Sequence, residues 1–165
     1  MEWLNEPAEW QHEGNDLVIV PDQGSDFWRL TEYGFIHDNG HALLTPVDGD
    51  FVATVTVSAD YRAQYDQAGL MIRIDECNWL KTGIEHVDGR CFLSTVVPRD
   101  YSDWSVAPLE GETVQIESSL NGESVEALRV AFLPAHAGWK VGPMACAPIE
   151  AGFAARFVDF KIEPR

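Results

Sequence analysis

The chain has 165 residues, which is enough for one domain with its own hydrophobic core. It carries 27 acidic against 11 Lys and Arg residues, a formal net charge of −16. Phosphate backbones and anionic lipids repel such a surface, which argues against nucleic-acid and membrane binding. Because no apolar run approaches about 18 residues and the N-terminal residues resemble no signal peptide, we expect a cytoplasmic protein with one domain over residues 1–165.

Taken in chain order, the first strong signals are turns and one alternating strand. The run Asp38-Asn39-Gly40 predicts a turn, and so does Asp48-Gly49. After the second turn, apolar and polar residues alternate over residues 51–58, which is typical of a half-buried strand.

The next three predicted strands cover residues 68–75, 79–86 and 90–97. Leu70, Ile72 and Ile74 share one face of the first strand, and the opposite face carries polar residues. Asp88-Gly89 predicts a two-residue hairpin between the second and third strands. We therefore expect a three-stranded meander with one apolar face and one polar, aromatic face.

Near the C-terminus, the sequence predicts a further hairpin at Asn121-Gly122 and a strand over residues 152–164. The apolar parity of that strand changes between Phe157 and Val158, which indicates a bulge or a strand covered on both faces. About a dozen short strands and no capped helical pattern predict an all-β sandwich or barrel.

Catalytic and metal-binding motifs are missing from the sequence. His37 and His41 have the spacing of a helical metal pair, but the turn between them rules out that geometry. The three cysteines, Cys77, Cys91 and Cys146, match no metal or redox motif, and we expect free thiols. We predict no metal and no cofactor; acidic loops such as the one with Asp48 and Asp50 match no EF-hand.

Asp75 and Glu85 are weak candidates for a catalytic pair. Glycoside hydrolysis needs two carboxyl groups about 5–9.5 Å apart. The period-two pattern places both side chains on the same face of the meander, where we expect them to be neighbours across the sheet. Two acids on a solvated face are ordinarily just solvated, so an enzyme on carbohydrate ranks last among our hypotheses.

The polar face of the meander is the better candidate site. It combines an aromatic ring with charged groups, and Lys81 is central to it in a chain with only two other lysines. Such a face suits a polyhydroxylated or small anionic ligand, although the pattern fits equally well a concave face that packs against a loop and pairs its charges across strands. The candidate ligand-binding residues are Arg73, Trp79, Lys81, Glu85, Arg99 and Trp104.

Several motifs resemble one domain family along nearly the whole chain. The family carries the label "regulation of enolase protein 1, concanavalin A-like" and has no established reaction. The resemblance implies a concanavalin A-like jelly roll of two antiparallel sheets, a fold shared by lectins, glucanases and carbohydrate-binding modules. The matching stretches are residues 3–7, 26–29, 33–35, 40–41, 49–51, 65–73, 79–85, 102–105 and 141–144.

One region departs from the family pattern. Residues 108–132 are about ten residues short, and Val125 stands where the family usually has Trp. If a strand is lost there, an exposed sheet edge could pair with a second copy to form a homodimer.

These observations lead to three ranked hypotheses. The first is non-catalytic binding of a carbohydrate or sugar-derived ligand on the concave sheet face. The second is a protein-interaction or regulatory module of carbon metabolism, and the third is a carbohydrate-active hydrolase. Fold alone does not choose among them.

Overall fold

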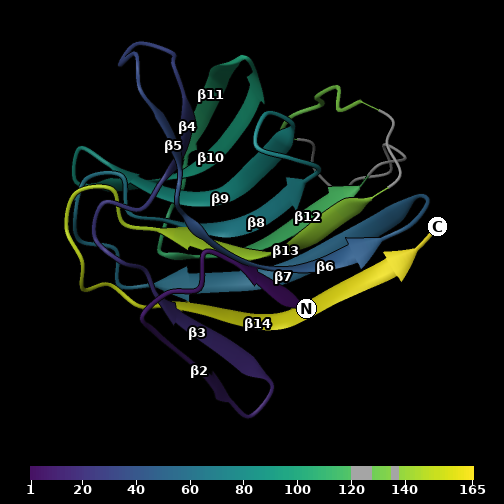
Figure 1. Ribbon diagram of the computed structural model, residues 1–165. Coiled ribbons are helices and arrows are strands. Elements are labelled where there is room, and N and C mark those ends of the chain that lie inside the picture. Colours follow the sequence, from purple (N-terminus) through teal and green to yellow (C-terminus); the bar gives the residue numbers. More distant parts are fainter. Residues whose placement is uncertain (120–127, 135–137) are drawn as a thin grey trace.

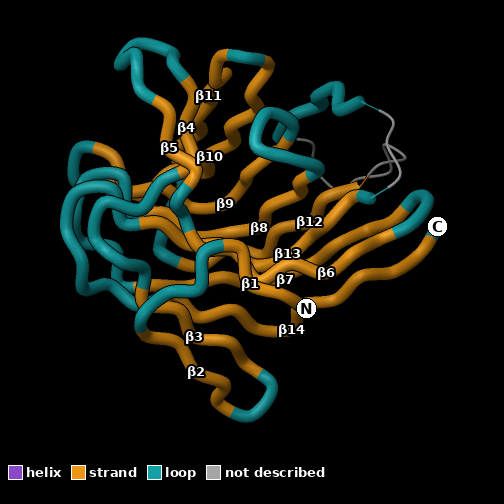
Figure 2. Tube along the Cα trace, viewed as in Figure 1, coloured by secondary structure: helices purple, strands orange, loops and turns teal. Residues whose placement is uncertain are grey.

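The computed structural model describes residues 1–119, 128–134 and 138–165. Figure 1 shows two large sheets packed face to face, with a hairpin standing on the outer side of one of them. The described residues form fourteen strands and no helix (Figure 2), so none of them forms a membrane-spanning helix. The all-β prediction is confirmed.

The larger sheet has seven strands, and every ladder in it is antiparallel. Its central strands β8, β9 and β10 form the predicted meander, which β11 extends. In spatial order the strands are β1 (Glu2–Leu4), β6 (His41–Val47), β13 (Trp139–Cys146), β8 (Gln67–Arg73), β9 (Trp79–Val87), β10 (Arg90–Arg99) and β11 (Tyr101–Pro108).

The smaller sheet has five strands and is also antiparallel. Its order is β12 (Thr113–Ser119), β7 (Phe51–Ala59), β14 (Ala155–Pro164), β3 (Asp16–Val20) and β2 (Glu9–Glu13).

The main core lies between these sheets. Alternate residues of β7, such as Val55 and Val57, pack against the apolar face of β8, including Leu70 and Ile72. All four are at most 4% exposed, as period-two burial requires of facing strands.

A two-stranded hairpin, β4 (Phe27–Arg29) and β5 (Ile36–Asp38), covers the other face of the seven-stranded sheet. In Figure 1 the sheet curves around this hairpin. Phe27 packs into a second core with Trp79 and Met71, and all three side chains are fully buried. From sequence, this face could either bind a ligand or pack against a loop. In the structure the hairpin covers it, which a strand pattern could not reveal because the cover comes from elsewhere in the chain.

The predicted turns at Asp48-Gly49 and Asp88-Gly89 each connect two strands, whereas Asp38-Asn39-Gly40 is the end of β5 and a short link to β6 rather than a turn. Asp88 and Gly89 both have positive φ angles, 49° and 76°, as a tight hairpin between β9 and β10 needs. The parity change in β14 is a bulge, since its register on β7 shifts between Val158 and Lys161, and Asp159 has φ 55°. The predicted hairpin at Asn121-Gly122 lies outside the described residues.

The short region after β11 still supplies an edge strand. β12 pairs with β7 along its whole length, from Thr113 opposite Ser58 to Ser119 opposite Val52. Residues 120–127, which belong to the short region 108–132, lie outside the described residues.

Candidate functional site

The hairpin is fixed to the sheet below it by a buried ion pair. Lys81 lies on β9 with its side chain toward the hairpin, and its Nζ is 3.0 Å from Asp26 Oδ1, just before β4. The Gln67 amide donates a second hydrogen bond, of 3.2 Å, to the same oxygen. Burial lowers the pKa of Lys81, but the nearby charges of Asp26 and Glu85 more than offset this, so the pKa is raised and the side chain is an ammonium.

Glu85, two alternate positions along β9, is the second buried charged group. Its Oε2 accepts hydrogen bonds from Ser94 Oγ at 2.5 Å and from Trp104 Nε1 at 2.9 Å. Burial raises the pKa of Glu85, although Lys81 and these two donors act in the opposite direction. Among the described residues, no group donates a hydrogen bond to the other oxygen, Oε1, and this oxygen is not fully buried.

Two tyrosines lie near the end of β9 that carries Glu85. The hydroxyls of Tyr33, at the tip of the hairpin, and Tyr65 are 3.3 Å apart. Tyr65 is held next to the end of β9 because its backbone N–H donates to the carbonyl of His86. The hydrogen bond with Tyr65 raises the pKa of Tyr33 to about 12, and burial and the nearby acidic groups, Glu85 among them, act in the same direction.

Aromatic rings connect the hairpin with β11. Trp28 meets Trp104 edge-on at 6.5 Å and packs against Tyr33 at 5.9 Å, and Tyr33 stacks on Phe35 at 5.3 Å. Trp104, Tyr33 and Phe35 are 37–48% exposed. We call Glu85, Ser94, Trp104, Tyr33 and Tyr65 the rim site, since they lie where the covered face of the sheet reaches solvent.

Three glycines allow neighbouring strands of the seven-stranded sheet to approach closely near Lys81 and Ser94, and we call this place the glycine crease. Gly69 on β8 lies opposite Gly83 on β9, and Gly142 lies on the neighbouring β13. A Cβ atom on any of them would meet a backbone oxygen of the next strand within about 2 Å, so only glycine allows this close approach. A small cavity of about 10 Å³, the room of one water molecule, lies here and is lined by Gly83, Lys81, Ser94 and Gln67, among others.

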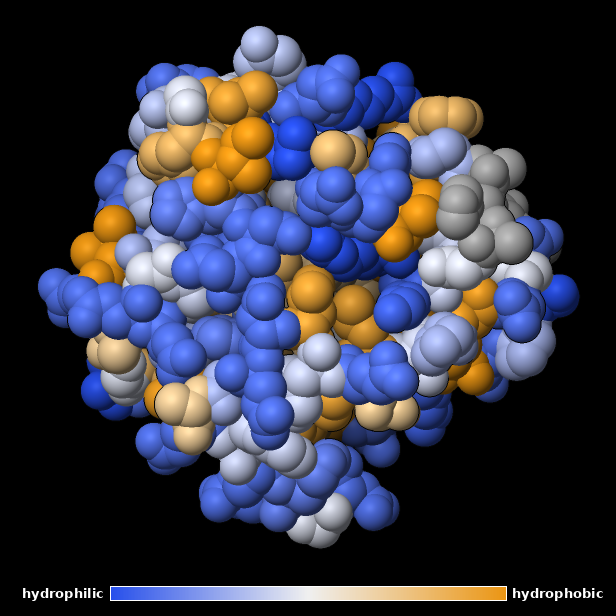
Figure 3. Space-filling model, in the orientation of Figure 1, coloured by the Kyte–Doolittle hydropathy of each residue, from blue (hydrophilic) through white to orange (hydrophobic). Residues whose placement is uncertain are grey.

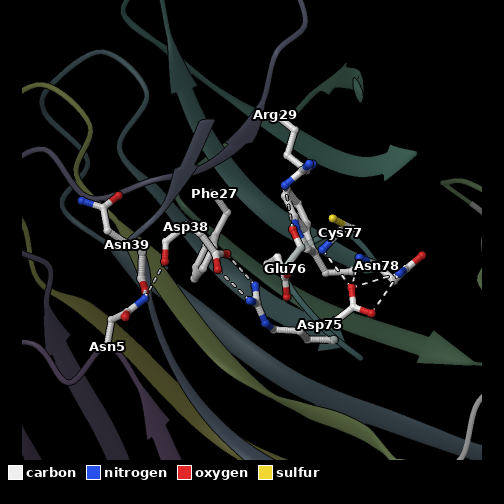
Figure 4. Close-up of polar contacts among 12 residues, drawn as sticks. Asn5, Phe27, Arg29, Asp38, Asn39, Asp75, Glu76, Cys77 and Asn78 are labelled. Carbon is white, nitrogen blue, oxygen red and sulfur yellow. Dashed lines mark hydrogen bonds and ion pairs between the residues drawn. The ribbon is translucent and has the colours of Figure 1, made fainter. Parts of the chain in front are cut away.

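A second ion pair holds the same end of the β4–β5 hairpin, since Asp38 lies opposite Phe27, the residue next to Asp26. Arg73 on β8 donates two hydrogen bonds to the carboxylate of Asp38 on β5, from Nη1 to Oδ1 at 2.6 Å and from Nη2 to Oδ2 at 2.7 Å (Figure 4). Such bidentate pairs fix orientation as well as charge. Arg73 is thus occupied within the protein.

Asp75 lies in the turn between β8 and β9, and it has a structural role there. One of its oxygens accepts backbone hydrogen bonds from Cys77 and Asn78, both at 2.8 Å (Figure 4). The expectation that Asp75 and Glu85 are neighbours is wrong. In the register of β8 and β9, Arg73 lies opposite Trp79 and Gln67 lies opposite Glu85. Asp75 is therefore at the turn between these two strands and Glu85 is at their other end, about 20 Å away at 3.3 Å per residue.

The structure therefore separates the six predicted ligand-binding residues into groups. Lys81, Glu85 and Trp104 come together at or beside the rim site. Trp79 is fully buried under the hairpin, and Arg73 pairs with Asp38. Arg99 lies at the far end of β10, where its guanidinium stacks over Phe132 at 5.0 Å.

Sequence reasoning missed the hairpin's contribution to the rim site. Asp26, Tyr33 and Tyr65 are distant from β9 in sequence, and no spacing rule connects them to it. Ser94, by contrast, has the same parity as Val96 on β10, so the alternation pattern would have placed it on the face of Lys81.

No group of three potential metal ligands occurs in the described ranges. His37 lies against Phe35, while His41 is buried and takes a hydrogen bond from the backbone of Asp22. The two histidines face different surroundings and form no pair.

Fold and site together define a jelly-roll domain whose covered face ends in a small aromatic and acidic site. Residues 3–165 match the family model described as "Protein of unknown function (DUF1349)", and the chain belongs to that family. The resemblance found from the motifs is confirmed.

Known proteins place the chain more closely. It is 36% identical over 173 residues to "Regulation of enolase protein 1" of Saccharomyces cerevisiae, covering 97% of this chain and 87% of that protein. A crystal structure of a functionally unknown protein from Saccharomyces cerevisiae superposes with a TM-score of 0.89 at 35% identity, covering 99% and 96% of the two chains.

More distant structures share the fold alone. The GH43 protein BlXynB of Bacillus licheniformis has a TM-score of 0.68 at 15% identity; the match spans 97% of this chain but 36% of that one. The region of BlXynB that resembles this chain is therefore one part of a larger protein.

Proposed function

We propose that this protein is a non-catalytic binding domain for a carbohydrate or sugar-derived ligand, which it holds at the rim site. The observation that supports this most directly is the Glu85 carboxylate: one oxygen is fixed by Ser94 and Trp104, and the other is open to a donor from a ligand. A sugar hydroxyl is such a donor.

The groups around Glu85 have the chemistry of a sugar site. Tyr33 and Tyr65 supply hydroxyls that both donate and accept, and Trp104 supplies a partly exposed ring on which the apolar face of a sugar packs. Because the hairpin fixes Tyr33 and β11 fixes Trp104, little conformational entropy is lost on binding.

The experiment is a calorimetric titration with a panel of neutral monosaccharides, disaccharides and sugar phosphates. We expect binding by at least one class, and an affinity loss of about tenfold or more in Trp104→Ala and in Tyr33→Phe. Tyr101→Ala is the matched control, because Tyr101 is 62% exposed on the same strand as Trp104 but lies outside the rim site, opposite Arg99. No heat from any member of the panel would refute the proposal.

The same incubations distinguish binding from hydrolysis. Asp75 is too distant to act with Glu85, so the pair considered from sequence lacks the required separation. Release of free sugar that disappears in Glu85→Gln would assign hydrolysis to this site and contradict the non-catalytic proposal.

A protein partner is the second candidate function. The hairpin carries the exposed apolar residues Tyr33, Phe35 and Ile36, and β11, which packs against the hairpin through Ser102 and Trp104, carries the exposed Tyr101 and Val106. In Figure 3 the visible face is mainly hydrophilic, with an apolar patch where Figure 1 draws the hairpin and β11. Since a 36% identical yeast protein is named for regulation of enolase, we would test binding of purified enolase by the wild type and by Phe35→Ser. Equal or absent binding would reject this role.

A further inference from the structure

A second pocket lies at the opposite end of β10 from the rim site. Its volume is about 340 Å³, within the range of small-molecule sites. We call it the turn pocket, because it is bordered by the β8–β9 turn, the β10–β11 turn and a third segment; its lining is Cys77, Asn78, Pro98, Arg99, Asp100, Phe132, Leu133 and Pro134.

Two of its walls are held in place by hydrogen bonds or backbone geometry. The Asp75 carboxylate fixes the backbone of Cys77 and Asn78, and the Glu76 carbonyl accepts from Arg29 Nη1 at 3.2 Å (Figure 4). The β10–β11 turn is tight, with Asp100 at φ 66°. The two walls that come from the β8–β9 and β10–β11 turns are therefore formed before any ligand arrives.

Arg99 is the polar group that would orient a ligand. It forms no ion pair with a carboxylate in the described part of the chain, although acidic residues outnumber basic ones by more than two to one. Its guanidinium carbon lies 5.0 Å from the centroid of the Phe132 ring, a cation–π contact. Pro98, Leu133 and Pro134 supply an apolar wall.

We propose that the turn pocket binds a small organic monocarboxylate with an apolar or aromatic body. The carboxylate pairs with Arg99, and the body packs against Phe132 and the apolar wall. Asp100 at the same turn carries a negative charge, which favours a singly charged carboxylate over a dianionic phosphate ester.

The first test uses three matched probes: 3-phenylpropanoate, its neutral analogue 3-phenylpropanol, and propanoate, which lacks the ring. By calorimetry and ligand-observed NMR, we expect 3-phenylpropanoate to bind at least tenfold more tightly than either other probe. Arg99→Gln should remove that preference. The control is Arg90→Gln, at the other end of β10 and about 30 Å away, which should leave it unchanged.

The second test uses Cys77 as a reporter within the pocket. Its thiol is partly exposed, so iodoacetamide should alkylate it, and saturating 3-phenylpropanoate should slow that reaction several-fold in the wild type but not in Arg99→Gln. Equal binding of the acid and the alcohol, no binding by either, or no protection of Cys77 would each overturn the proposal.

Discussion

The ammonium nitrogen of Lys81 lies 3.0 Å from a carboxylate oxygen of Asp26, fifty-five residues away in the sequence, and their side chains are 4% and 16% exposed. Through this contact the β4–β5 hairpin is held on the seven-stranded sheet. A buried charge without its partner is costly, whereas an apolar or neutral replacement of both partners often is not.

We therefore expect Lys81→Met to lower the free energy of unfolding by about 3–5 kcal/mol, because Asp26 keeps its charge without a partner. The double variant Lys81→Met with Asp26→Asn should recover much of this loss. Urea denaturation of the single and double variants measures both values. Arg62→Met is the control, since the exposed Arg62–Asp60 pair should contribute under about 1 kcal/mol. A double variant as unstable as the single one would contradict the role of the pair.

Glu85 should make stability depend on pH. Its pKa is raised in the folded state, so the folded protein binds the proton more tightly than the unfolded chain does. This contribution is fully present below pH 4.5, the ordinary pKa of a glutamate side chain, and is lost as the pH rises through the folded-state pKa. Glu85→Gln removes the titration, so the variant should gain stability relative to the wild type between pH 4 and pH 7. Urea denaturation at both pH values tests this, and an unchanged difference would refute it.

The glycine crease should tolerate no side chain. In Gly83→Ala the new Cβ would meet the carbonyl oxygen of Ala68 at 2.1 Å, so we expect a loss of about 3 kcal/mol or failure to accumulate as folded protein. Gly89→Ala has a positive φ of 76° but open space around it, and should lose only about 1 kcal/mol. Thermal melts and soluble yield compare the two, and equal effects would show that crowding at the crease is unimportant.

The three thiols should differ in reactivity. Burial raises the pKa of Cys146, which is fully buried, and it raises the pKa of Cys91 as well. Because the thiolate is the reactive form, Cys146 should resist alkylation in the folded protein and react only after unfolding. Mass mapping after brief treatment with iodoacetamide checks this. Cys77 is the internal reference, and alkylation of Cys146 at the rate of Cys77 would contradict the packing.

The sequence predicted much of the sandwich because alternation and turn chemistry are local signals. Val55 and Val57 reveal the buried face of β7, and Asp88-Gly89 reveals a hairpin, without any knowledge of distant residues. The parity change in β14 likewise predicted its bulge.

The site was harder to predict, because its parts meet only through tertiary structure. Alternation placed Trp79 and Lys81 correctly on the face opposite Leu70, but it could not show that a hairpin covers that face. It also gave Asp75 and Glu85 the same parity, and parity says nothing about distance along a strand. Register decides that distance, and it depends on the turn at residues 75–78.

The long sequence separation of the hairpin's anchors has a consequence for the order of folding. Asp26 and Asp38 can find Lys81 and Arg73 only after β8 and β9 have paired, and closing such loops early is entropically unfavourable. We expect the hairpin to dock late, after the rate-limiting step. Weakening these anchors should then mainly speed unfolding and leave the refolding rate nearly unchanged.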